Sequence, residues 1–193
     1  VVTCSADLAL AASRADVAAV VVHPMEPDVP PSPPGEFVVV PGASTAKGAD
    51  IAAEVARRLP AVRFLVIRTY GGVVDSLAGL PNVTLAGPIP PTDFLARMAV
   101  CLFPSRRENW PMAPRLAAMH GRPVIARNLS AIMDSTGDGA CYVETDDPAK
   151  WASWVRRALE AGEAFGEVPP VDRDAEMEAL EAALSAGWAG EAV

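Results

Sequence analysis

The sequence lacks several features that would assign it to a secreted or membrane class. Its three cysteines, at positions 4, 101 and 141, are odd in number and show no Cys-x-x-Cys spacing, so we expect reduced thiols. No apolar run reaches the roughly 18 residues that a membrane-spanning helix needs. No signal peptide opens the chain. These absences predict a cytoplasmic protein without a transmembrane segment.

Basic residues, histidines and nucleotide-binding motifs are also scarce. Sixteen Lys and Arg against 24 Asp and Glu give a formal net charge of −8, which disfavours nucleic acid as a partner. His23 and His120 stand apart from other ligand-type residues, so we expect no metal site. Neither a Walker A motif nor Gly-x-Gly-x-x-Gly is present, which disfavours mononucleotide hydrolases and dinucleotide oxidoreductases.

Short apolar segments alternate with amphipathic ones through most of the chain. Helix periodicity places Ile51, Val55 and Leu59 on one face. Buried strands separated by helices predict an α/β fold with a doubly wound, Rossmann-like parallel sheet. The expected strands are 36–40, 62–67, 83–86, 100–103, 123–126 and 141–143, and the expected helices are 47–59, 92–98, 111–120 and 148–160.

A proline-rich segment divides the chain, since six of the thirteen residues from His23 to Gly35 are proline. We expect residues 1–28 to be a strand-helix-strand remnant of a preceding domain, with strands at 1–4 and 17–22 and a helix at 6–14. Residues 29–35 would be the linker and 36–165 the main domain. In 171–193, a helix over about 174–188 has an apolar stripe that needs a partner surface: Met177, Leu180, Leu184 and Trp188.

The loop after the first strand of the main domain is a candidate ligand site, because ligands of open parallel sheets bind beyond the carboxyl ends of the strands. Gly42 and Ser44 are small enough to let a ligand approach the backbone. Lys47 stands where the helix is expected to begin, which costs roughly 0.3 to 1 kcal/mol unless a phosphate binds there. The alternative is a solvated lysine on a helix that begins a few residues later.

A second strand-to-helix loop, residues 103–111, carries charge. Pro111 suits the first helical position, with Asn109 or Trp110 as the cap. Glu108 is a candidate catalytic group, or an ordinary carboxylate at a helix start. Arg106 adds positive charge at the same mouth, or pairs with acidic neighbours on the surface.

These two loops, in this order, resemble the C-terminal, donor-binding domain of retaining GT-B glycosyltransferases of the group 1, or family 4, kind. The likeness runs from about Phe37 to Leu159. It rests on Lys47-Gly48, LPAVRF at 59–64, PNVTLAG at 81–87, FPS at 103–105, Glu108 and AAMHGRPVIA at 117–126. It implies that Lys47 contacts the donor diphosphate, that Glu108 faces the donor sugar and that backbone near Gly87 contacts the base. It also implies that residues 1–28 end the acceptor domain and that the 171–193 helix packs back on it.

The sequence departs from the family pattern in three places. Leu116 stands where the family has a second glutamate, eight positions after the first, that binds the ribose. Pro111 replaces a glycine, and Pro114 removes another amide, leaving Met112 and Ala113 as the donors in that turn. The run from Gly42 to Ser44 replaces the arginine usual at the start of the first loop.

The resemblance implies transfer of a sugar from a UDP- or GDP-sugar, with retention of configuration, to an unknown acceptor. Glu108 would be the catalytic residue, and no cofactor besides the nucleotide sugar is expected. The expected donor-binding residues are Gly42, Ser44, Lys47, Gly87, Arg106, Asn109, Trp110, Met112 and Ala113. We expect the isolated chain to be inactive, since the partner N-terminal domain is missing. One alternative is a degenerate, non-catalytic GT-B domain that binds a partner. Another is an unrelated doubly wound signalling domain, but such a domain would have an acidic pocket at the first strand ends, and the first loop here has no carboxylate.

Overall fold

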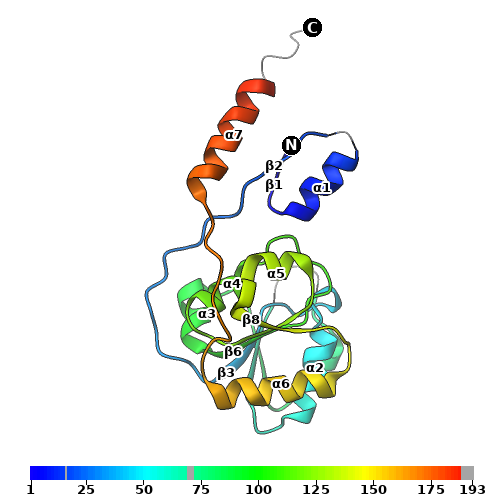
Figure 1. Ribbon diagram of the computed structural model, residues 1–193. Coiled ribbons are helices and arrows are strands. Elements are labelled where there is room, and N and C mark those ends of the chain that lie inside the picture. Colours follow the sequence, from blue (N-terminus) through cyan, green and yellow to red (C-terminus); the bar gives the residue numbers. More distant parts are fainter. Residues whose placement is uncertain (16, 69–71, 188–193) are drawn as a thin grey trace.

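The main body of the protein is a six-stranded parallel sheet covered by helices on both faces (Figure 1). The computed structural model describes residues 1–15, 17–68 and 72–187. Its strands are β3 (Phe37–Val40), β4 (Phe64–Ile67), β5 (Val83–Ala86), β6 (Met98–Phe103), β7 (Val124–Arg127) and β8 (Ala140–Val143). The helices of this body are α2 (Ala49–Arg58), α3 (Pro91–Arg97), α4 (Met112–Met119), α5 (Ser130–Thr136) and α6 (Pro148–Ala161).

The strand order β5-β4-β3-β6-β7-β8 makes the sheet doubly wound. Within this sheet, the first strand in chain order is the central strand β3. The chain then adds β4 and β5 on one side of β3 and crosses back to place β6 on the other side. The direction of winding therefore reverses between β3 and β6. Ligands of such sheets bind where the winding reverses, beyond the carboxyl ends of the strands.

Two apolar cores, one on each face, hold the sheet in place. Helices α2 and α6 cover one face, with Ile51 and Trp151 in its core. Helices α3, α4 and α5 cover the other, with Phe94, Ala117 and Ile132 in its core. Strands buried on both faces are typical of a parallel sheet, and the predicted doubly wound α/β fold is confirmed.

Several predicted boundaries need correction, and two of them concern the candidate site. Helix α2 begins at Ala49, because residues Thr45–Lys47 form a separate 3₁₀ turn that ends at Gly48, with a φ of 71°. Lys47 therefore precedes the helix. Pro111, with an extended ψ of 111°, is the cap of α4 and not its first helical residue. Helix α5 is not predicted by the sequence, because two of its four buried residues, Ser135 and Thr136, are polar and leave no apolar period.

The other boundaries differ by up to three residues. One end of strands β3 and β4 and of helix α6, and both ends of strand β7 and helix α3, differ from the prediction by one or two residues. Strand β6 begins two residues earlier than predicted, and β8 begins one residue earlier. The strand expected over 17–22 is only β2 (Val20–Val21). Helix α1 (Ala6–Arg14) and strand β5 have the predicted bounds. Such differences arise because hydrogen bonding to neighbouring strands decides where a strand ends.

The N-terminal segment forms a small unit of its own, in which β1 (Val2–Thr3) pairs in parallel with β2 and α1 connects them. Helix α7 (Arg173–Gly187) lies beside β2 (Figure 1). Arg173 donates to the carbonyl of His23 at 2.6 Å. Met177 and Leu184 of the predicted stripe are about half exposed, and Trp188 lies outside the described residues. The domain division of the chain stays a prediction.

The proline-rich connector is held on the main body by two buried arginines. Arg122 donates to the carbonyls of Ser32 and Pro33, at 2.6 and 2.9 Å. Arg115 donates to Glu26 at 2.7 Å and to the carbonyl of Pro169 at 3.0 Å. Arg115 therefore joins the connector to the segment that leads from α6 to α7. In the part of the chain that is described, no helix is both long and apolar enough to cross a membrane.

Candidate functional site

The two loops that the sequence singled out lie against each other beyond the carboxyl ends of β3 and β6. The amide of Arg106 donates to the carbonyl of Ala46 at 2.9 Å. Gly48 lies so close to the second loop that a Cβ at this position would be 2.2 Å from the carbonyl oxygen of Pro104. A residue with a side chain would push the loops apart. The glycine thus permits both the positive φ and the close contact.

Lys47 and Glu108 meet at this junction. Lys47 Nζ lies 2.6 Å from Glu108 Oε1, with 33% of the lysine side chain and 10% of the glutamate side chain exposed. Gly42 makes room for the lysine, since a Cβ there would lie 2.6 Å from the Cβ of Lys47. The sequence reasoning expected these residues to converge, and the structure brings them together. Their roles toward a ligand stay predictions.

A cavity of about 330 Å³ opens at this ion pair, and we call it the polar cavity. Its lining residues are Pro41, Lys47, Phe103, Glu108, Pro111, Met112 and Ala113. The start of α4 forms one wall. The first amides of a helix have no acceptor within the helix, and Pro111 and Pro114 have no N–H, so only Met112 and Ala113 present free amides here. The polar cavity therefore offers an ammonium, a carboxylate and two amide donors.

A second cavity of about 270 Å³ adjoins the polar cavity and shares Pro41, Met112 and Ala113 with it. We call it the apolar cavity. Its other lining residues are Ile67, Pro88, Ile89, Pro91, Phe94 and Leu116. No hydroxyl, amide or charged side chain is among these residues, which the structure places between the ends of β4 and β5 and the helices α3 and α4.

Arg106 does not line either cavity. Its guanidinium donates to both carboxylate oxygens of Asp50, at 2.7 and 2.9 Å, and to the carbonyl of Thr45 at 2.7 Å. Asp146 lies 3.5 Å away. The hydrogen bond from Arg106 lowers the pKa of Asp50 below its ordinary value. The structure thus gives Arg106 the surface pairing that the sequence left open, and its hydrogen bond to Thr45 holds the 3₁₀ turn that ends with Lys47.

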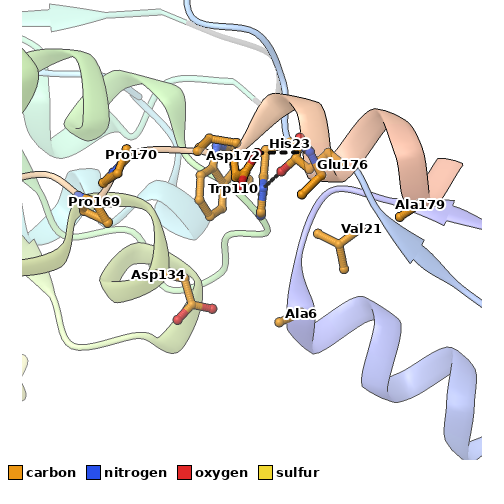
Figure 2. A pocket seen from close by; sticks show the side chains of 12 residues that line it. Ala6, Val21, His23, Trp110, Asp134, Pro169, Pro170, Asp172, Glu176 and Ala179 are labelled. Carbon is orange, nitrogen blue, oxygen red and sulfur yellow. Dashed lines mark hydrogen bonds and ion pairs between the residues drawn. The ribbon is translucent and has the colours of Figure 1, made fainter.

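Trp110 is not part of the polar cavity but lines a third cavity of about 610 Å³, between the main body, the β1-α1-β2 unit and α7 (Figure 2). Its ring lies on the ring of His23, with 3.6 Å between centroids. His23 in turn contacts Glu176 of α7. The loop of residues 108–111 therefore separates two cavities, with Glu108 on one side and Trp110 on the other.

The remaining predicted residues lie around the site without a clear contact to it. Asn109 is exposed, and Ser44 precedes the 3₁₀ turn without capping it through its side chain. Gly87 follows β5, beside the apolar cavity, and a Cβ there would meet no atom within 4 Å. The described residues contain no group of three or more His, Cys, Asp or Glu side chains that could hold a metal ion.

The sequence does not predict the apolar cavity. Ile67 is the last residue of β4, so the rule that ligands bind at strand ends could have indicated it. Phe94 and Pro91 come from α3, and only the fold brings them to Leu116. An apolar residue that lines a cavity looks in sequence like any core residue.

The family model for Glycosyl transferases group 1 matches residues 36–161, which is more than half of the chain. The match covers the whole sheet and both loops of the site. The chain therefore belongs to the Glycosyl transferases group 1 family. No curated protein sequence matches it significantly.

Solved structures of several glycosyltransferases share the fold. Anabaena Alr3699/HepE, in complex with UDP and glucose, has a TM-score of 0.68 at 14% identity, over 98% of this chain and 62% of that chain. S. aureus TarM, with UDP among its ligands, has a TM-score of 0.66 at 16% identity, over 95% and 40%. The pneumococcal O-GlcNAc transferase GtfA, with UDP and GlcNAc, has a TM-score of 0.60 at 14% identity, over 94% and 41%. This chain thus spans about 40 to 62% of the length of these proteins.

Proposed function

We propose that the chain binds the nucleotide-sugar donor of a retaining glycosyltransferase, which transfers a sugar from UDP or GDP to an acceptor. The observation that carries the proposal is the contact of 2.6 Å between Lys47 and Glu108 in a cavity that also has two free helix amides. An ammonium and helix amides bind a diphosphate, and a carboxylate beside them binds sugar hydroxyls. The family match supports sugar transfer as the chemistry.

The charges of the polar cavity fit the step in which the donor bond breaks. Negative charge then develops on the leaving diphosphate. Lys47 and the amides of Met112 and Ala113 would stabilise this charge, and they are in place before the reaction begins. Glu108 would hold the transferred sugar beside the diphosphate. Its carboxylate is largely buried, so it keeps a fixed position.

Two features support a UDP donor and a further domain. Structures with the same fold have UDP bound, among them Alr3699/HepE and TarM. The chain spans less than two thirds of the length of these proteins, and the β1-α1-β2 unit presents exposed Val1, Val2, Leu8 and Leu10. We infer that this unit completes an acceptor domain, that the chain without the rest of that domain does not turn over, and that the enzyme acts in the cytoplasm.

Calorimetric titration of the chain with UDP, GDP and their sugars tests donor binding. At least one of these ligands is expected to bind, and Lys47→Ala should weaken it by roughly 1 to 3 kcal/mol, the value of a charge-assisted hydrogen bond. Lys150→Ala is the matched control, because this exposed lysine lies on α6 and outside both cavities. Equal affinity of Lys47→Ala and Lys150→Ala would remove Lys47 from the site. Binding of none of these nucleotides would contradict the proposal and favour the degenerate, partner-binding alternative.

A further inference from the structure

The apolar cavity continues from the polar cavity along α4. Met112 and Ala113, which begin α4, line both cavities, and Leu116 lines only the apolar one. Leu116 follows Met112 by four residues, which is one helical turn or about 6 Å along the axis. The pentose of a nucleoside diphosphate is bonded directly to the diphosphate. A diphosphate at the amides of α4 therefore brings the pentose close to Leu116.

The surroundings of Leu116 give a pentose hydroxyl no side-chain partner. Leu116 is 5% exposed, and its neighbours in the cavity wall are Phe94, Ile67 and Met112. None of the described residues of this wall has a hydroxyl, amide or charged side chain. A hydroxyl that leaves water for such a wall loses hydrogen bonds that no side chain of the wall replaces.

We propose that the nucleoside of the donor lies in the apolar cavity and that, with Leu116 in the wall, the site does not select for the 2′-hydroxyl. The site then accepts 2′-deoxynucleoside diphosphate sugars as well as ribonucleoside diphosphate sugars. The inference rests on the proposed function, because the polar cavity must hold the diphosphate. It adds a substrate class, and it makes Leu116 the residue that sets the choice of pentose.

The strength of the selection follows from the chemistry of the wall. A site built to hydrogen-bond a hydroxyl rejects the analogue without it by about 10⁴ to 10⁵, whereas an apolar wall disfavours an added hydroxyl by at most about 100-fold. The deoxynucleotide should thus bind between equally tightly and roughly 100-fold more tightly than the ribonucleotide.

Titration calorimetry measures the ratio of the deoxynucleotide and ribonucleotide affinities of the chain. Two matched pairs are compared, UDP against 2′-deoxy-UDP and GDP against 2′-deoxy-GDP. A deoxynucleotide that binds at least as tightly as its ribonucleotide supports the proposal. A ribonucleotide that binds more tightly than its deoxynucleotide overturns it and leaves the proposed function intact, since an apolar wall gives no preference of that sign. If no member of either pair binds, both the inference and the proposed function are overturned.

Substitution of Leu116 tests its part directly. Leu116→Gln places an acceptor of similar size in the wall and should move the ratio toward the ribonucleotide by about tenfold, the effect of one hydrogen bond. Leu116→Glu is the second variant, and either one suffices if the other does not fold. Met119→Gln on the same helix is the control, because Met119 is 48% exposed and outside the cavity. A ratio that stays unchanged in the folded Leu116 variant overturns the role of Leu116.

Discussion

Lys47 Nζ lies 2.6 Å from Glu108 Oε1, although 61 residues separate the two in the chain. The contact joins the loop after β3 to the loop after β6, at the point where the winding of the sheet reverses. Without a ligand, the carboxylate neutralises the ammonium. A diphosphate would compete with Glu108 for Lys47, so the two residues should have opposite effects on nucleotide affinity.

Glu108→Gln is therefore expected to tighten the binding of UDP or GDP, while Lys47→Ala weakens it. Removal of the negative charge frees the ammonium of Lys47 and ends the repulsion between Glu108 and the diphosphate. We expect the binding free energy to improve by about 1 kcal/mol, the usual value of a partly exposed ion pair. Calorimetry on the two variants and on the double variant gives the coupling. If Glu108→Gln weakens nucleotide binding as Lys47→Ala does, Glu108 does not compete for Lys47.

Gly42→Ala should weaken nucleotide binding and also lower stability. The new Cβ would lie 2.6 Å from Lys47 Cβ and 2.8 Å from its Cγ, and because the backbone fixes the position of a Cβ, the loop backbone must shift together with the lysine side chain. A displaced ammonium loses part of a charge-assisted hydrogen bond, and we expect a loss of about 1 kcal/mol in binding free energy. Calorimetry and thermal unfolding measure the two effects. Gly87→Ala is the control for unfolding, since its Cβ meets no atom within 4 Å. Unchanged affinity in Gly42→Ala would show that the position of the lysine does not matter.

Arg106→Ala should lower the free energy of unfolding by about 1 to 3 kcal/mol, because it removes three hydrogen bonds, two of them to a carboxylate. Chemical denaturation measures this loss. Arg107→Ala is the matched control, since this neighbouring side chain is exposed. A variant that unfolds like the wild type but fails to bind nucleotide would show that Arg106 is instead a ligand of the donor.

The ion pairs of Glu26 should make stability depend on pH in the acid range. Burial raises the pKa of Glu26, but the hydrogen bonds from Arg173 and Arg115 outweigh it and hold the pKa at about 2, against an ordinary value of 4.5. The carboxylate thus stabilises the fold above about pH 4.5, and this contribution is lost as the pH falls from there through about 2.

Glu26→Gln removes this contribution, so the difference in unfolding free energy between the wild type and the variant should shrink as the pH falls through this window. Urea denaturation at several pH values between about 2 and 7 measures it. Glu54→Gln is the control, because Glu54 also accepts from two arginines but is exposed, and exposed pairs contribute little. A constant difference across the window would show that Glu26 is not held by these arginines.

Helix and strand positions followed from local pattern wherever the pattern was long. Helix α6, with a buried face of Trp151, Val155 and Ala158, was predicted to within one residue. The first turn of α2 was placed two residues early, because nothing local shows that Gly48 adopts a φ of 71° against Pro104. Helix α5 is not predicted, because polar Ser135 and Thr136 make up half of its buried face and hide the apolar period.

For the site, the sequence indicated which residues have suitable chemistry but not which residues they contact. The sequence alone determined that an alternating α/β chain places Lys47 and Glu108 after two strands, since parallel strands put such loops at one edge of the sheet. The tertiary structure alone decided that Lys47 meets Glu108, that Arg106 turns to Asp50 and that Trp110 turns to His23. The physical reason is distance along the chain: periodicity acts over a few residues, whereas these contacts depend on how the sheet and connector pack.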